Sequence, residues 1–241
     1  MVRILASLAI ILLWLTSLFY LLNLKIYLLH PGLILLAIFW QTFLYTGLFI
    51  TAHEAMHGLI CPQNLRVNHL IGAIAVSLYA FFPYKKLLIK HGLHHRYPAT
   101  PRDPDFHDGR NTSFWGWYFH FLKGYGCWRQ LGGLLASFIL ISYGLHIPVI
   151  NLALFILLPS ILSSLQLFYF GTFLPHREPE GGYRYPHRSQ SHAIPSFWSF
   201  MACYHFGYHQ EHHEQPQVPW WHLPKIYRQS RERLTASFDT K

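Results

Sequence analysis

A stretch of 44 residues, from Leu131 to Leu174, contains no Asp, Glu, Lys or Arg. A helix needs about 20 apolar residues to cross ~30 Å of hydrocarbon, so this stretch is long enough for two crossings. Pro148 is available for a turn between them, and Pro159 is expected to kink the second helix. The stretch therefore predicts two membrane helices arranged as a hairpin.

Two apolar segments nearer the N-terminus, Ile4–Leu24 and Gly32–Ile50, are each about long enough to cross once. The first is too long for a signal peptide and no A-x-A-like cleavage site follows it, so we expect a retained helix. Leu70–Phe82 is apolar but too short to cross, and Ser196–Tyr204 is aromatic and suited to an interface. We therefore predict an all-α integral membrane protein with about four transmembrane helices and a short re-entrant or interfacial segment.

The charged residues support this prediction, because they make up only 12% of the chain, against about 25% in soluble domains. Sixteen of the 19 Lys and Arg residues lie in two blocks, Tyr84–Gln130 and Pro175–Lys241. The positive-inside rule predicts that both blocks face the cytoplasm. The net charge of +9 comes without a nucleic-acid-binding motif, so no nucleic-acid partner is expected. We expect one domain over residues 1–241, with a basic tail from about residue 225.

Histidines gather in the polar segments that follow the predicted spans, in one H-x-x-x-H box, two H-x-x-H-H boxes and a single position. Residues three and four apart share one face of a helix, so each box can present its imidazoles together. One tetrahedral zinc takes at most four protein ligands, so nine histidines are enough for two metal ions with open positions. Imidazole suits iron, copper, zinc and nickel, and the ligands alone do not identify the metal. The expected ligands are His53, His57, His91, His94, His95, His176, His209, His212 and His213.

Two more histidines are additional candidates. His205 stands one turn before His209 and shares its face if that stretch is helical, and His187 lies in the same polar block. Three nearby acids, Asp103, Asp105 and Glu54, are expected to orient ligand imidazoles by hydrogen bonding.

Two other classes of protein fit part of this pattern. His53-Glu54-x-x-His57 matches the H-E-x-x-H signature of zinc proteases, which would make the chain an intramembrane protease, but seven histidines stay unexplained. A metal transporter should hold its ligands near the bilayer midplane on broken helices, whereas these histidines follow the ends of the predicted spans.

The boxes together resemble the membrane fatty-acid desaturase/hydroxylase superfamily. More narrowly, the chain is similar to the bacterial and cyanobacterial type of β-carotene 4-ketolase, chiefly through Phe-Gly-Thr-Phe-Leu-Pro-His and Tyr-His-Phe-Gly-Tyr-His. Glu54 departs from the pattern, because these ketolases usually have Asp after the first histidine. The matching stretches are His53–Gly58, His91–His95, Asp103–Phe106, Phe168–His176 and Cys203–His213, running on to Pro224.

The resemblance implies a histidine-bound pair of iron ions that uses O₂, with electrons from reduced ferredoxin or a similar donor. It implies insertion of a keto group at C4 of the β-ionone rings of β-carotene, giving echinenone or canthaxanthin. The implied route is two hydroxylations at one carbon followed by loss of water, in the plasma or thylakoid membrane. An acyl-lipid desaturase or fatty-acid hydroxylase is the alternative within the same superfamily.

Overall fold

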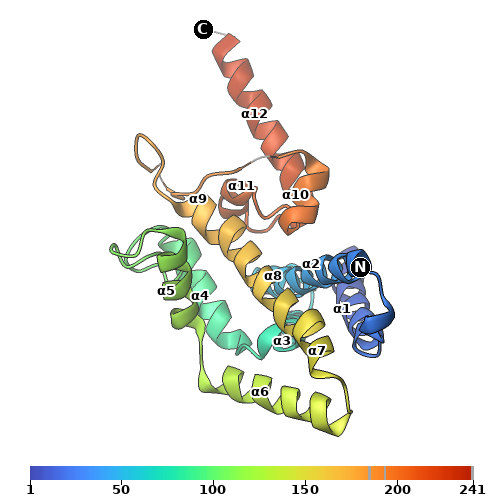
Figure 1. Ribbon diagram of the computed structural model, residues 1–241. Helices are drawn as coiled ribbons and strands as arrows, with labels where there is room; N and C mark the ends of the chain where they lie inside the picture. Colours follow the sequence, from blue (N-terminus) through green and yellow to red (C-terminus); the bar gives the residue numbers. More distant parts are fainter. Residues whose placement is uncertain (184–185, 193, 240–241) are drawn as a thin grey trace.

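The computed structural model describes residues 1–183, 186–192 and 194–239, with side chains described as far as residue 233. The described residues form helices and connecting loops (Figure 1). Three helices are long and apolar enough to cross a membrane: Val2–Leu22, Pro31–Met56 and Val149–His176. The pair Leu65–Ala80 and Tyr84–Arg96, bent by 101°, is a fourth crossing if it counts as one broken span, and otherwise the re-entrant segment expected at Leu70–Phe82. The prediction of an all-α membrane protein with about four spans is confirmed.

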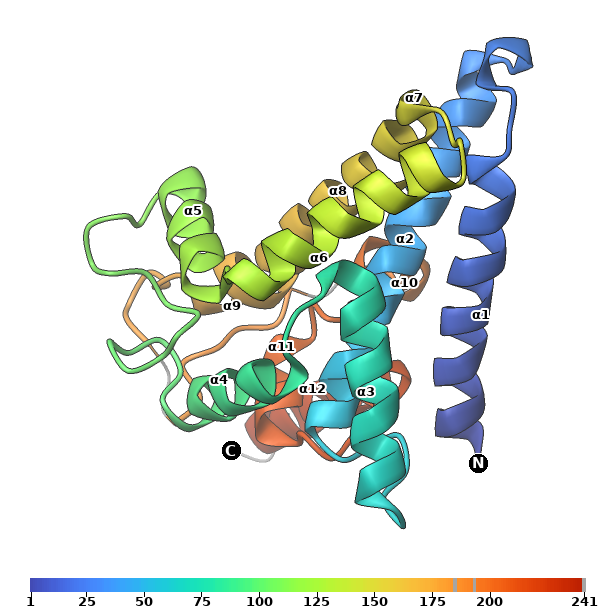
Figure 2. The ribbon, with the colours of Figure 1, turned by 90° about the horizontal axis from the view of Figure 1, so that it is seen from below.

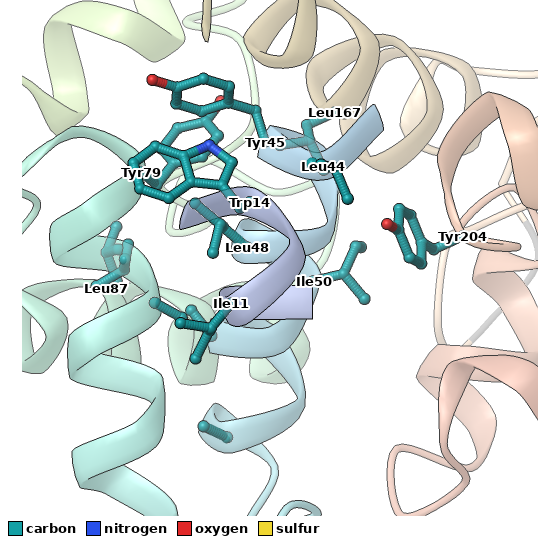
Figure 3. Packing of buried hydrophobic residues seen from close by; sticks show 14 of the residues in the cluster. Ile11, Trp14, Leu44, Tyr45, Leu48, Ile50, Tyr79, Leu87, Leu167 and Tyr204 are labelled. Atoms are coloured by element: carbon teal, nitrogen blue, oxygen red, sulfur yellow. The ribbon is translucent and has the colours of Figure 1, made fainter. Parts of the chain in front are cut away.

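Helix α2 (Pro31–Met56) is the centre of the molecule. It begins at Pro31, where the His30 side chain accepts a hydrogen bond from the Gly32 amide. Helices α1 (Val2–Leu22), α3 (Leu65–Ala80) and α8 (Leu158–Phe168) pack around it. The shared core includes an edge-to-face pair of Trp14 and Tyr45 with ring centroids 5.3 Å apart (Figure 3).

Buried polar contacts fix these helices to one another inside the apolar core. The Thr46 hydroxyl on α2 lies 2.9 Å from the Ser163 hydroxyl on α8. The Asn151 amide donates to the carbonyls of Leu22 and Leu24, at 3.0 and 2.9 Å, just where α1 ends. These contacts satisfy carbonyls that a helix end leaves free, and they set the position of α8 against α1 and α2.

The long helix Val149–His176 is continuous but contains two π-helical turns, η3 (Ala153–Leu157) and η4 (Tyr169–Phe173). They separate α7 (Val149–Leu152), α8 and α9 (Leu174–His176). Pro159 and Pro175 each stand two residues after a π turn. A proline lacks the amide hydrogen and clashes with the carbonyl four residues before it, and the wider turn accommodates it. The sequence predicted a kink at Pro159, and the structure accommodates this proline with a π turn.

The charge-free stretch folds into two helical arms, with α6 (Trp128–Ile139) and η2 (Leu140–Gly144) as the first and Pro148 as the N-cap of the second. Of the two arms, only the second is long and apolar enough to count as a membrane span, so the prediction of two crossings here is met by one. The arms are splayed: α6 overlaps α8 in Figure 2 but diverges from it in Figure 1. Helix α6 rests on α3 instead, where a Cβ at Gly133 would lie 2.6 Å from Phe81. Helix α6 therefore packs against α3 and not along the second arm of the hairpin.

The polar block after α3 is more helical than the sequence suggested. It contains α4 (Tyr84–Arg96) and α5 (Phe114–Tyr125), joined by a loop over residues 97–113. The C-terminal part holds α10 (Ser196–Cys203), α11 (His209–Glu214), η5 (Trp220–His222) and α12 (Leu223–Asp239). The basic tail expected from about residue 225 is α12, which projects away from the body in Figure 1; residues 240–241 lie outside the described part.

Candidate metal centre

The ends of α2, α4, α9 and α11 bring all nine predicted ligands together. The imidazoles fall into two groups, and within each group the ligand nitrogens all lie within 4.8 Å of one another. We call the groups site A and site B. Site A consists of His53, His57, His91, His95 and His212, and site B of His94, His176, His209 and His213.

Each H-x-x-H-H box contributes to both sites. Helix α4 gives two histidines to site A and one to site B, and α11 gives two to site B and one to site A. In each box the two residues four positions apart share a site, because they share a helix face, and the remaining histidine points toward the other site. The pair from α2 completes site A, and the single histidine of α9 completes site B.

The ring nitrogens approach one another closely within each site. The Nε2 atoms of His57 and His91 lie 2.7 Å apart, and those of His95 and His212 lie 3.0 Å apart. In site B, Nε2 of His213 lies 3.1 Å from Nε2 of both His94 and His209.

Two further ring nitrogens indicate whether the sites can accept a metal ion. The Nε2 atoms of His53 and His176 are buried without a hydrogen-bond partner among the described residues. Buried polar atoms are rarely left unpaired, since this costs free energy. A cation bound by the converging nitrogens would satisfy them, so the donors of both sites fit a metal ion.

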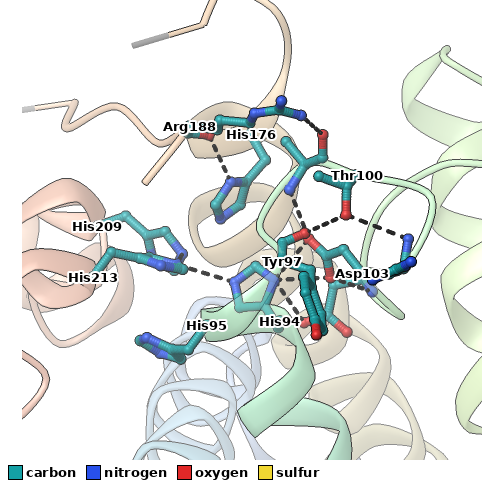
Figure 4. Close-up of polar contacts among 12 residues, drawn as sticks. His94, His95, Tyr97, Thr100, Asp103, His176, Arg188, His209 and His213 are labelled. Carbon is teal, nitrogen blue, oxygen red and sulfur yellow. Dashed lines mark hydrogen bonds and ion pairs between the residues drawn. The ribbon is translucent and has the colours of Figure 1, made fainter. Parts of the chain in front are cut away.

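Asp103 holds His94 in position. Its carboxylate oxygens lie 3.0 Å from His94 Nδ1 and also accept hydrogen bonds from the Ala99 and Asp105 amides, each at 2.9 Å (Figure 4). This arrangement puts the proton of His94 on Nδ1 and leaves Nε2 free to bind a metal. The structure therefore places Asp103 where the sequence predicted an orienting carboxylate.

Asp105 is the second acid beside His94, with Oδ2 at 3.8 Å from His94 Nδ1. Its carboxylate also accepts a hydrogen bond from the Tyr125 hydroxyl. Burial raises the pKa of Asp105. Burial acts in the same direction on Asp103, but the interaction with His94 outweighs it and holds the pKa of Asp103 below its usual value.

Sequence reasoning missed two residues that support the sites. The Arg188 carbonyl lies 3.1 Å from His176 Nδ1, and its guanidinium donates to the Ala99 carbonyl at 3.0 Å, next to the Asp103 loop (Figure 4). Asn68 accepts from the amides of Ile60 and Cys61 and donates to the Ala55 carbonyl at 2.7 Å, which fixes the end of α2. The role of Arg188 depends on its backbone carbonyl, which leaves no signal in a sequence. For Asn68, the only sign in the sequence was an isolated Asn in an apolar helix.

Three predicted residues lie outside both sites. The Glu54 side chain lines a small cavity with Arg3 and Trp220, because it is rotated by about 100° from His53 on α2. His205 has φ +63° and precedes α11, which begins only at His209, so it does not share the helix face of the ligands. The ring of His187 lies 6.3 Å from that of His213, at the edge of site B.

A cleft enclosing about 910 Å³ leads to the two sites, and part of this space is open to the outside. Its inner end carries His53, His91, His94 and His209, and Asp105 lies beside them. Its walls are mostly aromatic and aliphatic and come from α2, α3, α5, the start of α6 and the α8–η4 segment. These helices therefore form a largely apolar passage to the histidines.

Comparison with known proteins identifies the family of this chain. The model of the fatty acid desaturase family matches residues 25–129 and 123–239. A β-carotene ketolase of Paracoccus sp. (strain PC1) is 42% identical over 198 residues, which is 81% of this chain and 80% of that protein. A zeaxanthin 4-ketolase of Chlamydomonas reinhardtii is 44% identical over 188 residues, which is 76% of this chain and 41% of that protein. The chain belongs to the fatty acid desaturase family, alongside its β-carotene ketolase members.

Proposed function

We propose that this chain is a membrane oxygenase that inserts a keto group at C4 of β-ionone rings, converting β-carotene to echinenone or canthaxanthin. One observation carries the proposal: two histidine sites stand side by side at the end of an apolar cleft. The names of the similar proteins supply the substrate class. The whole of residues 1–241 would act as one oxygenase domain.

The two sites would hold one iron each, site A through five imidazoles and site B through four. When bound, the irons would supply the oxidising power of O₂ at the inner end of the cleft. The protein's own part is to orient the imidazoles and to fix which ring nitrogen carries the proton. Asp103 does this for His94, and the Arg188 carbonyl does it for His176.

The cleft would hold the apolar polyene and present one ring to the sites. Each hydroxylation replaces a C4–H bond by C4–OH, consumes one O₂, two electrons and two protons, and releases one water. A second hydroxylation at the same carbon gives a geminal diol, which loses water to form the ketone. C4 is allylic and has a weakened C–H bond, so the protein's task is to select this carbon and exclude water.

The electrons would come from reduced ferredoxin or a similar protein on the cytoplasmic side, to which the sites would face in the plasma or thylakoid membrane. Arg96 and Arg102, both exposed and flanking the Tyr97 ring, lie close in sequence to the ligands of α4. A basic surface there would attract an acidic donor.

The zinc protease interpretation fits the structure poorly. A protease of that class needs the glutamate of its box beside the metal as a general base. Here Glu54 lies with Arg3 and Trp220, and His53 and His57 are joined by three other histidines. The acyl-lipid desaturase or fatty-acid hydroxylase shares the iron sites, and product analysis separates it from a ketolase.

The test is pigment analysis, by chromatography with mass spectrometry, of a β-carotene-accumulating bacterium that expresses the chain. We expect echinenone or canthaxanthin, both absent when His212→Ala is expressed at the same level in membranes. Unchanged β-carotene with an iron-loaded protein would reject the ketolase, and an altered acyl-chain profile would then identify a lipid enzyme.

A further inference from the structure

Thr172 stands at the inner end of the cleft and has no function in the scheme above. It lies in the π turn η4, is 5% exposed, and lines the cleft together with His94 and His209. It also precedes His176 by four residues, so its side chain shares the helix face that carries a ligand of site B.

The Thr172 hydroxyl differs from three other helical threonines in its hydrogen bonding. Thr16, Thr42 and Thr46 each donate to the carbonyl four residues before them, at 2.8, 2.8 and 3.1 Å. This is the usual way in which a helical threonine satisfies its hydroxyl in apolar surroundings. Thr172 makes no such bond, and it lies in a π turn, where the α-helical register is interrupted. Thr51 also lacks a partner among the described residues, but it lines the small cavity beside Glu54 and not the cleft.

Two other hydroxyls that line the cleft take part in hydrogen bonds. Tyr125 donates to Asp105, and Ser164 accepts from Tyr118 at 3.0 Å. Over the described residues, no hydrogen bond engages the Thr172 hydroxyl, and the residue lines a largely apolar cleft next to ligands of both sites.

The proposed reaction creates a partner for such a group. After the first hydroxylation the ring carries a C4–OH, which is buried in apolar surroundings and needs a hydrogen bond. The ketone forms only if the same carbon is oxidised again, so the alcohol must stay in the cleft with its remaining C4–H toward the iron sites. A fixed hydroxyl at the inner end can hold the alcohol in that orientation.

We propose that Thr172 hydrogen-bonds the C4 hydroxyl of the alcohol and thereby directs the second oxidation to the same carbon. This inference rests on the proposed ketolase function and assigns Thr172 the role of separating a ketolase from a simple hydroxylase. The parent carotenoid offers no hydroxyl at C4, so Thr172 contributes little to the first step.

The test is the ratio of 4-hydroxylated to 4-keto carotenoids made by Thr172→Val, which has nearly the same shape but lacks the hydroxyl. We expect consumption of β-carotene to continue while this ratio rises roughly tenfold, the effect of one lost hydrogen bond. Thr172→Ser, which restores the hydroxyl, should restore ketone formation. Thr42→Val, a buried helical threonine outside the cleft, should leave the ratio unchanged.

Binding provides a second measurement that needs no turnover. Without O₂ or reductant, the iron-loaded protein in lipid nanodiscs should bind 4-hydroxy-β-carotene more tightly than β-carotene, measured by quenching of tryptophan fluorescence. Thr172→Val should remove this preference and leave the affinity for β-carotene unchanged. This comparison decides the question even if the variant makes too little product to analyse.

Each result has one meaning. An unchanged ratio in Thr172→Val, an equal fall of alcohol and ketone, or failure of Thr172→Ser to restore the ketone would overturn the role of Thr172. Retention of the binding preference in Thr172→Val would overturn it too. If the unaltered protein makes no oxygenated carotenoid at all, the proposed ketolase function itself fails.

Discussion

His94 and His95 are adjacent in the chain, yet their imidazoles belong to different sites: His94 contacts His213, and His95 contacts His212. Successive residues of a helix point about 100° apart, so an adjacent pair serves two centres that lie side by side. The rings of His95 and His213 stack with centroids 4.3 Å apart, and this is one place where the two sites touch.

Replacing either member of this pair should empty mainly one site. We expect His94→Ala to lower the iron content of purified protein to about half, and to do so more completely than His95→Ala, because site B has four imidazoles and site A five. Elemental analysis against protein concentration measures this. His120→Ala, outside both sites, is the control, and equal iron content in all three variants would contradict the assignment.

Asp103→Asn should weaken site B without removing a ligand. The amide group would present a donor where the carboxylate now accepts from His94, Ala99 and Asp105. We expect roughly 10- to 100-fold lower metal affinity, measured by competition with a chelator. Asp108→Asn changes an exposed loop acid that caps the amides of Arg110 and Asn111, and its metal affinity should match the unaltered protein.

Gly171→Ala should destabilise the protein next to both sites. A Cβ there would lie 2.4 Å from the Phe206 ring, which packs against His53 and His209 at 4.8 and 5.1 Å. Overpacking of this kind costs about 1–3 kcal/mol, and thermal unfolding in detergent measures it. Adding Phe206→Leu should recover part of the loss.

The matched control for this substitution is Gly132→Ala, in α6, where a Cβ would have nothing within 4 Å. Alanine is the better helix former, so stability should hold or rise slightly. A loss in Gly132→Ala equal to that in Gly171→Ala would show that packing against Phe206 is not the cause.

Asn68→Ala should loosen the end of α2. The amides of Ile60 and Cys61 and the carbonyl of Ala55 would be buried without their present partner, a loss of about 1–3 kcal/mol. Because His53 and His57 stand on that end, site A should lose iron before site B on mild heating. Asn23→Ala, which removes an exposed bond to the Phe19 carbonyl, should change neither property.

Much of the architecture was predictable because membrane helices and histidine boxes follow simple periodicities. The apolar lengths predicted the helical class and the three long spans, but not the bent pair of α3 and α4, and the box spacings predicted the nine imidazoles that the structure brings together. The charge-free stretch gave the hairpin but not its splay, which depends on the contact of Gly133 with Phe81. That contact joins residues far apart in the sequence, and no periodic pattern reports it.

The division of the histidines into two sites was not predictable from spacing alone. A box shows which residues share a face, but which box meets which depends on the approach of α4, α9 and α11. Glu54 illustrates the same limit. It follows His53 in the sequence, but it points from a different face of α2, and the sequence does not show which residues lie against that face. His205 would share the ligand face only if its stretch were helical. The helix begins four residues later, at His209, because Tyr204 and His205 both adopt positive φ.

The π turns of the long helix restrict how its length can vary among related proteins. Each π turn accommodates one extra residue within an α-helix. Deletion of one residue from η4 would change the spacing on the helix between Phe168 and Thr172, which line the cleft, and His176 of site B. Relatives that keep both sites should therefore tolerate insertions in the loops around this helix, and none between Phe168 and His176.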